Sequence, residues 1–421
     1  MWSIKKFIPL ILCLSLLVGQ GMMNGFGLGH FYKNQGISSA GNGLNSLIPE
    51  FQNNVSLCNP STWHNLKYTH LSLSYSGNEN TISDLSLMNR YSGLSYASWI
   101  VPFKSKGSLG LALVPYLDQR ITLTDTDTSF IAFDDTLNLL NSFERSGGVM
   151  AFKIGTSYLM SENLSVGLSV DMLFGSSRQN ESVFFDGSSI IQTSRTRYSG
   201  ILGEVFISLA LQEKINLYAS VKQALRDLDG IYTEKHLFDD ANGNGYHDYG
   251  YPEDFPLPDS VSAKNQIRLT GIHKPKQISF GAQSKLNKQT SISFEFTSIK
   301  EKGKIPLPLT LPINDWIKYS NDFKLSLVRF PNNISLNLLD KILFRTGLLY
   351  KSHKLDSEKN VSEIGGSLGF GFKFKAVGNQ VDFNYYLGNR KYSDTFKTEI
   401  IQQIQVGVSL GDLWFVKRRQ K

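Results

Sequence analysis

The sequence has little cysteine. Only two of its 421 residues are cysteines, Cys13 and Cys58. Cys13 lies in an N-terminal leader, so the mature chain keeps one cysteine and has no internal disulfide. Small secreted domains often depend on disulfides for stability. This chain must gain its stability in another way.

Long apolar runs are also scarce. Hydrophobic residues make up 41% of the chain and the mean hydropathy is −0.17, which is too low for a bundle of membrane helices. The one run, residues 7–18, follows Lys5 and Lys6 and precedes Gly19 to Gly21. A basic start, a short apolar centre and small residues predict a signal peptide over residues 1–21. Leu12 stands where a lipoprotein signal would need a small residue before Cys13.

Catalytic and nucleic-acid-binding patterns are missing as well. The seven histidines are scattered, with no HExxH spacing for zinc, and residues 93–97 only half-match a nucleophile elbow. Glu295 and Asp171 are interpreted as solvated lumen charges rather than as a catalytic acid. The net charge of +7 comes partly from the leader and from the tail, residues 416–421, without a basic stripe among aromatics. We expect no enzyme and no nucleic-acid partner.

What the sequence does contain is alternation. Between residues 364 and 375, apolar and aromatic side chains such as Leu368 and Phe370 alternate with small or polar ones such as Ser367 and Gly369. The same pattern runs through residues 164–172, 292–297 and 404–410. A soluble sandwich can also alternate, but in an outer-membrane barrel the two faces meet lipid and lumen.

The connections between these segments are of two kinds. Short ones fall at residues 104–107, 160–163, 212–214, 286–289, 330–340 and 375–379. Long ones fall at residues 76–85, 120–147, 175–198, 226–263, 299–321, 351–362 and 388–397. Together they predict an all-β fold over residues 67–415, a 14-stranded antiparallel transmembrane β-barrel. Short turns and termini would face the periplasm, which places the chain in the bacterial outer membrane, surrounded by membrane lipid.

Residues 22–66 lack this rhythm and are rich in glycine, asparagine and serine. This N-terminal segment, preceding the first strand, either dangles in the periplasm or folds into the barrel as a hatch or plug. Small residues such as Gly365, Gly369 and Gly371 would let the backbone of a plug approach the wall. Alternatively, these glycines mark bulges that curve the wall.

The same N-terminal segment carries a family resemblance. Residues 36–43, which include Gly41 and Gly43, are followed by Asn59 and Pro60 and resemble the opening of the FadL family of outer-membrane transporters. Asn59-Pro60-Ser61 departs from the family's Asn-Pro-Ala, and residues 107–116, 275–285 and 411–415 also look similar. The resemblance implies a fourteen-stranded barrel, an N-terminal hatch and a lateral opening through an irregular third strand. Members carry long-chain fatty acids and other hydrophobic compounds, and PorV-like proteins are relatives.

Pro115 lies in the middle of the predicted third strand, residues 109–124. Proline removes a donor from the ladder and is normally excluded there. We expect a broken hydrogen bond and a bulge, which would make a weak seam suited to lateral release of an apolar solute. The alternative is a bulge of no consequence near the rim.

Two outer loops are more apolar than exposed loops usually are. The first predicts one apolar stripe on a short helix, formed by Phe130, Phe133, Leu137 and Leu140. The second, residues 305–317, is punctuated by three prolines and contains Leu307, Leu309, Leu311 and Trp316. Exposed apolar patches usually mark ligand or partner sites, although the two loops could also pack on each other as a lid.

One local motif resembles a calcium loop. Oxygen-bearing side chains stand at positions 1, 3, 5 and 9 of an EF-hand-type spacing, with a glycine at 6 and a backbone carbonyl at 7: Asp240, Asn242, Asn244, Asp248, Gly245 and Tyr246. Position 12 is Tyr251 rather than glutamate, which predicts weak binding of a structural Ca²⁺. The alternative is an Asn/Gly-rich turn without metal. No other cofactor is expected.

The leading functional hypothesis is passive transport of hydrophobic or amphipathic small molecules, long-chain fatty acids among them, across the outer membrane. Loops would capture the solute, the hatch would gate the lumen, and the seam at Pro115 would release it sideways. A PorV-like role with a secreted-protein partner, in secretion or surface attachment, is the alternative. A purely structural barrel is a third interpretation.

Overall fold

The computed structural model describes residues 21–32, 36–52, 54–82, 87–103, 106–132, 135–185, 188–212, 214–234, 238–239, 242, 248–250, 253–254, 266–304, 313, 315–332, 338–374, 379–393 and 398–412. The predicted signal peptide and basic tail therefore lie outside the described residues, apart from Gly21. Among the described residues, no helix has the length and apolar character needed to cross a bilayer.

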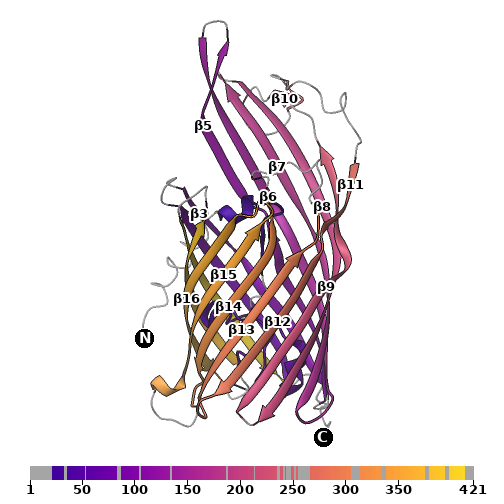
Figure 1. Ribbon diagram of the computed structural model, residues 1–421, viewed down its shortest axis with the longest axis vertical. Helices are drawn as coiled ribbons and strands as arrows, with labels where there is room; N and C mark the ends of the chain where they lie inside the picture. Colours follow the sequence, from indigo (N-terminus) through magenta and orange to yellow (C-terminus); the bar gives the residue numbers. More distant parts are fainter. Residues whose placement is uncertain are drawn as a thin grey trace.

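The chain forms a closed antiparallel β-barrel (Figure 1). Of the eighteen strands in the described part of the chain, β1, β5, β10 and β11 lie outside the ring, which leaves fourteen within it. The last ring strand pairs with the first, from Glu399↔Ile82 to Asp412↔Thr69, and this pairing closes the ring. The predicted fourteen-stranded barrel is confirmed.

The ring strands follow one another in chain order: β2 (Thr69–Ile82), β3 (Leu87–Phe103), β4 (Gly107–Asp118), β6 (Asp135–Leu159), β7 (Leu164–Phe185), β8 (Ser188–Gln212), β9 (Ile215–Glu234), β12 (Pro275–Lys285), β13 (Thr290–Glu301), β14 (Ile317–Arg329), β15 (Ile342–Leu355), β16 (Asn360–Phe374), β17 (Asn379–Tyr392) and β18 (Glu399–Asp412). The other described elements are short or lie beside the ring: η3 (Met22–Gly25), β1 (His30–Phe31), η4 (Ala40–Asn42), η5 (Pro60–Asn65), β5 (Ile121–Ala132), β10 (Phe238–Asp239), β11 (Gln266–His273) and η7 (Leu338–Lys341).

Side chains on the ring strands alternate between lipid and lumen as the sequence predicts. On β7, Leu168 and Met172 are 51% and 44% exposed, whereas Asp171 between them is 2% exposed. On β18, Ile404 is exposed and Gln405 is buried. Apolar side chains thus form a belt on the outer surface, and polar side chains face the lumen. This belt places the barrel in the bacterial outer membrane.

The strand ends that the sequence predicts match the structure at one end of the barrel only. The predicted short turns are confirmed, for example between Leu159 and Leu164 and between Lys285 and Thr290. Several predicted long loops are wrong, because strands continue into them, whereas the connections from β9 to β12 and from β13 to β14 remain long. The β7–β8 ladder runs unbroken from Gly175↔Tyr198 to Phe185↔Ser188. Backbone hydrogen bonds continue the ladder beyond the bilayer. Strands there need no lipid-facing apolar side chains, so the sequence shows no alternation by which to predict them.

The predicted short helix at residues 130–140 is also wrong. Strand β5 pairs with β6, and Phe130 lies opposite Leu137 in this hairpin. The apolar spacing that suggested a helix therefore falls on two paired strands, whose ladder sets the backbone conformation. Phe133 lies outside the described residues, whereas Leu140 is an exposed residue of β6.

The wall is much taller on one side. Strands β6 and β8 each have 25 residues, whereas β14 has 13. At roughly 3.3 Å per residue, these lengths correspond to about 80 Å and about 45 Å. Figure 1 shows β5 to β8 rising far above the other strands at the end opposite the short turns. That end faces outward from the cell.

The described residues of the N-terminal segment, 21–32, 36–52 and 54–66, lie within the ring. Its helix η5 contacts β6 and β7, while η4 contacts β16 and β17. The described residues of the segment are mostly buried, including Ile37, Val55 and Leu57 at 0% exposure. The segment therefore occupies the lumen rather than dangling below it.

Candidate functional site

Glycines on the inner face of the wall make room for the N-terminal segment. Trp63, which is 1% exposed, packs on two of them. A Cβ added at Gly110 would lie 2.5 Å from Cζ3 of Trp63, and one at Gly155 would lie 2.8 Å from its Cη2. No larger residue fits at either position without displacing the indole.

Backbone meets backbone on the other side of the lumen. A Cβ on Gly41 would lie 2.7 Å from the Cα of Gly369, and Gly43 makes a similar approach to Gly347. The two other glycines expected to receive a plug have different neighbours, since Gly365 and Gly371 leave room for Tyr386 and Asp382 of the wall. Of that predicted column, Gly369 has the segment's backbone among its nearest neighbours.

Wall side chains also hold the segment through hydrogen bonds to its backbone. Glu295 accepts hydrogen bonds from the N–H groups of Ser46 and Leu47 at 3.0 and 2.8 Å. Lys324, the cross-strand neighbour of Glu295, pairs with its carboxylate at 2.7 Å and donates to the Leu44 carbonyl. Both charged side chains are 0% exposed.

Arginines bind the segment's carbonyl groups in the same way. Arg345 donates to the Glu50 carbonyl at 3.2 Å and pairs with Asp382. Arg145 donates to the carbonyls of Asn24 and Gly27 at 2.5 and 3.1 Å.

The predicted solvated lumen charges are therefore a wrong interpretation. Glu295 is fully buried, and Asp171 is paired with Lys222 at 2.5 Å. These carboxylates lose their water because the segment fills the lumen beside them. Sequence reasoning missed that these carboxylates hold the segment or pair with lysine. The signal in the sequence is a charged residue at a strand position where small residues otherwise face the lumen.

The predicted Asn-Pro motif stabilises the segment itself. Asn59 caps η5 by accepting a hydrogen bond from Ser61 N at 3.1 Å, and its amide donates to the Leu47 carbonyl at 2.9 Å. Pro60 begins η5 and packs on Gly167 of the wall. Serine in place of the family's alanine adds a hydroxyl that contacts Ser208 of β8.

The wall is split between β3 and β4. Their ladder runs from Phe103↔Gly107 and ends at Ala97↔Leu113. Strand β3 then continues with β2, while β4 stays with β6 and carries a bulge between Pro115 and Leu117. The predicted bulge at the third strand is confirmed, and Pro115 lies where the two strands separate.

The N-terminal segment occupies the split. Strand β1 pairs with β4 there, with Phe31 opposite Leu117, and Tyr32 N donates to the Tyr116 carbonyl at 2.9 Å. The Tyr32 hydroxyl donates to Asp118 at 3.2 Å. Sequence reasoning did not identify Tyr32, because its segment shows no periodic pattern.

Side chains from the wall complete the closure. Arg120 binds Asp118 through two hydrogen bonds of 2.8 and 3.0 Å and stacks on Tyr91 of β3, 4.5 Å from the ring centre. A small pocket beside Pro115 is lined by Tyr32, Tyr91 and Arg120. Strand β1 and a few side chains, rather than a β3–β4 ladder, therefore close this part of the wall.

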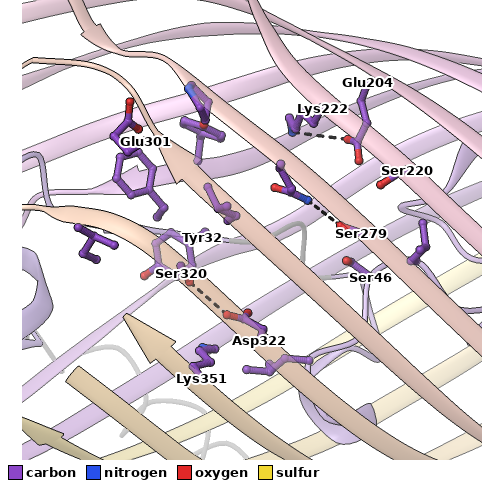
Figure 2. A pocket seen from close by; sticks show the side chains of 18 of the residues that line it. Tyr32, Ser46, Glu204, Ser220, Lys222, Ser279, Glu301, Ser320, Asp322 and Lys351 are labelled. Atoms are coloured by element: carbon purple, nitrogen blue, oxygen red, sulfur yellow. Dashed lines mark hydrogen bonds and ion pairs between the residues drawn. The ribbon is translucent and has the colours of Figure 1, made fainter. Parts of the chain in front are cut away.

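A cavity of about 120 Å³ lies between the segment and strands β4, β8, β9 and β11 to β15 (Figure 2). Its lining is partly apolar, with Phe31, Phe206 and Ile299, and partly charged, with Lys222 and Glu301 among others. Tyr32 lines both this cavity and the pocket at the split. The two spaces thus share Tyr32 in their linings.

A hydrogen-bonded group forms one end of the cavity. His273 is stacked on Phe31 with ring centres 4.4 Å apart, bonds to the Tyr116 hydroxyl at 2.6 Å and pairs with Glu301. Trp316 is half-buried beside a smaller pocket that Phe31 also lines. Trp316 thus lies close to the lumen, while the predicted loop residues Leu307, Leu309 and Leu311 lie outside the described residues.

Two predicted calcium ligands lie side by side. The amide of Asn242 donates to the Asp248 carboxylate at 2.5 Å, and Asp248 N donates to the carboxylate of Asp254 at 2.8 Å. Asp240, Asn244 and Tyr246 lie outside the described residues. The calcium site remains a prediction.

A family model named BamG matches residues 4–421. The chain belongs to the BamG family. The search of curated proteins finds no match to this BamG-family chain.

Solved structures of the same fold are FadL-type barrels. The CymD monoaromatic hydrocarbon channel has a TM-score of 0.56 at 14% identity, with 94% of this chain and 100% of CymD covered. A Pseudomonas aeruginosa FadL homologue has a TM-score of 0.59 at 12% identity, covering 92% and 99%. The Ralstonia pickettii toluene transporter TbuX has a TM-score of 0.53 at 14% identity, covering 93% and 99%. The FadL-type fold that the sequence predicted is confirmed for this BamG-family chain.

Proposed function

We propose that this protein is a passive outer-membrane channel for hydrophobic or amphipathic small molecules, with lateral release through the split beside Pro115. The observation that carries the proposal is the end of the β3–β4 ladder at Ala97↔Leu113, with a cavity on the lumen side. An apolar solute leaving there passes directly from protein to lipid. Partition from water into lipid supplies the driving force.

The lining of the cavity supports an amphipathic solute. Phe31 and Phe206 offer apolar surface. Lys222, Lys318 and Lys351 offer ammonium groups, each of which is paired with a carboxylate of the wall. Burial of a hydrocarbon chain contributes roughly 0.8 kcal/mol per methylene. Long-chain fatty acids carry both an apolar chain and an anionic head, so we propose them as substrates. The structures of similar fold described as hydrocarbon channels and toluene transporters fit the same class and are not enzymes.

The test is uptake of a fluorescent long-chain fatty acid by lipid vesicles that contain the purified protein. Pro115→Ala should restore a ladder donor, tighten the seam and slow uptake. Tyr32→Ala should remove a side chain that lines both the cavity and the pocket at the split, and should speed uptake. Pro102→Ala is the matched control, because Pro102 lies in the paired part of β3 opposite Ser108. Equal uptake by wild type, Pro115→Ala and Tyr32→Ala would contradict lateral release.

The second candidate is a PorV-like barrel that serves protein secretion or surface attachment. The feature in its favour is the tall wall, since β6 and β8 extend far beyond the length that a bilayer requires. Cross-linking in intact cells followed by mass spectrometry distinguishes the two roles. Abundant links from β6–β8 to one secreted protein, together with absent fatty-acid uptake, would favour this candidate.

A further inference from the structure

Three arginines lie together on the outer surface of the tall wall. Arg178 of β7 is the direct cross-strand partner of Arg195 of β8. Arg197 lies two residues further along β8. All three side chains are exposed. Direct cross-strand partners have Cβ atoms about 5 Å apart, and diagonal ones about 7–8 Å, so three positive charges share one small area.

Their orientation follows from their neighbours. Ser177 and Tyr198 are buried and hydrogen-bonded to each other at 3.0 Å inside the wall, and Thr196 is also buried. Because side chains alternate along a strand, Arg178, Arg195 and Arg197 point outward. On β7 the same outward row begins in the lipid-facing belt with Met172 and Phe174.

The height of the three arginines matches the headgroup layer of the outer leaflet. Arg178 follows Phe174, which is 47% exposed, by four residues, or about 13 Å along a tilted strand. This position is at the end of the barrel away from the short turns, and therefore on the outside of the cell. The row thus passes from hydrocarbon-facing side chains to arginine.

Two facing arginines repel each other unless an anion lies between them. Within the described part of the chain, none of the three forms an ion pair. The nearby carboxylate of Asp229 lies 3.9 Å from Arg226 and 3.8 Å from Arg268. On the same face, the exposed carboxylate of Glu144 lies diagonal to Arg178, whose direct partner on β6 is Ser146. The cluster therefore has an excess of positive charge at a surface that meets lipid.

We propose that Arg178, Arg195 and Arg197 bind a phosphate group on the headgroup of an outer-leaflet glycolipid. Guanidinium groups form paired hydrogen bonds with phosphate oxygens, and several around one phosphate also neutralise its charge. The acyl chains of the same lipid would lie along the belt below, against Met172 and Phe174. This site is on the outside of the barrel and is independent of the transport proposal.

The test uses the full-length mature protein in detergent micelles, with purified bis-phosphorylated lipid A and its dephosphorylated form as probes in native mass spectrometry. Wild type should bind the phosphorylated form at least about tenfold more tightly. Arg195→Glu should lose that preference while its melting temperature stays the same or rises, because glutamate pairs with Arg178. Arg268→Gln is the matched control on the same face and should retain binding, since Arg268 already faces Asp229.

Three outcomes would overturn the proposal. One is wild-type binding by Arg195→Glu, and a second is an equal loss in Arg268→Gln. The third is competition by millimolar inorganic phosphate, which would show a site for the free ion rather than for a lipid. If Arg195→Glu does not fold, the Arg178→Gln, Arg197→Gln double variant replaces it with the same expectations.

Discussion

Trp63 of the N-terminal segment packs on Gly110 of β4, with no room for a methyl group between them. Gly110→Ala should therefore force the indole away from the wall. Overpacking of this kind costs about 1–3 kcal/mol. The measurement is urea unfolding of the purified protein in detergent, with Gly77→Ala as control, because no atom lies within 4 Å of a Cβ added at Gly77. Equal losses in both variants would contradict the close packing.

Glu295 and Lys324 form the buried attachment of the segment to β13 and β14. Glu295→Gln should leave Lys324 buried without a counter-charge, at a cost of about 3–5 kcal/mol. Cys58, which is 4% exposed, reports whether the segment has moved, because a maleimide reaches it only after displacement. Faster labelling in Glu295→Gln is the expected result, and Glu79→Gln, at a partly exposed pair with Arg90, should label at the wild-type rate.

The fold was largely predictable because lipid imposes a period of two on every strand that crosses it. The facing of Leu168 and Phe370, the strand number and the short turns all follow from that constraint. Outside the bilayer the alternation stops, because no side chain has to face lipid. The extensions of β7 and β8 were therefore predicted as loops. The contacts of Tyr32 and Glu295 depend on which residues of an aperiodic segment meet which strand, and no local pattern encodes that pairing.

Arginine on either face of β16 should be costly, for different reasons. Phe370 is 43% exposed in the lipid-facing belt, and Phe370→Arg should cost about 2–4 kcal/mol. An open lumen would tolerate Ser367→Arg, but Ser367 is 5% exposed and accepts a hydrogen bond from Gly43 N at 2.8 Å. Refolding into lipid vesicles should show a loss for both variants. Deletion of residues 22–66 should relieve only the loss in Ser367→Arg.

The carboxyl group of Glu50 should make stability depend on pH. Burial raises the pKa of Glu50 above its ordinary value, against the opposing effects of Ser38 and Leu57, which donate hydrogen bonds to it. A raised folded-state pKa means that the stabilisation is present at acid pH and is lost as pH rises through that pKa. Relative to Glu50→Gln, wild type should therefore lose unfolding free energy as pH rises above about 4.3, the ordinary pKa of a glutamate carboxyl group. A difference that is constant across this range would contradict the expectation.

Calcium should stiffen the long connection after β9 if the motif at residues 240–248 binds it. The missing glutamate at position 12 predicts a dissociation constant of about 10⁻⁴–10⁻³ M. Millimolar calcium should then raise the melting temperature, a chelator should lower it, and Asp240→Ala should remove both effects. Magnesium at the same concentration is the control. A melting temperature that does not change with calcium would contradict the calcium site and favour the alternative, an Asn/Gly-rich turn without metal.

The unequal height of the wall gives the outer mouth of the barrel a direction. Strands β6 and β8 form a screen on one flank, whereas β14 ends after 13 residues. Solutes that diffuse through the surrounding water are shielded from the mouth on the screened flank. On the opposite flank no such extension stands between the lipid surface and the mouth, so the channel proposed above is most directly reached along that surface.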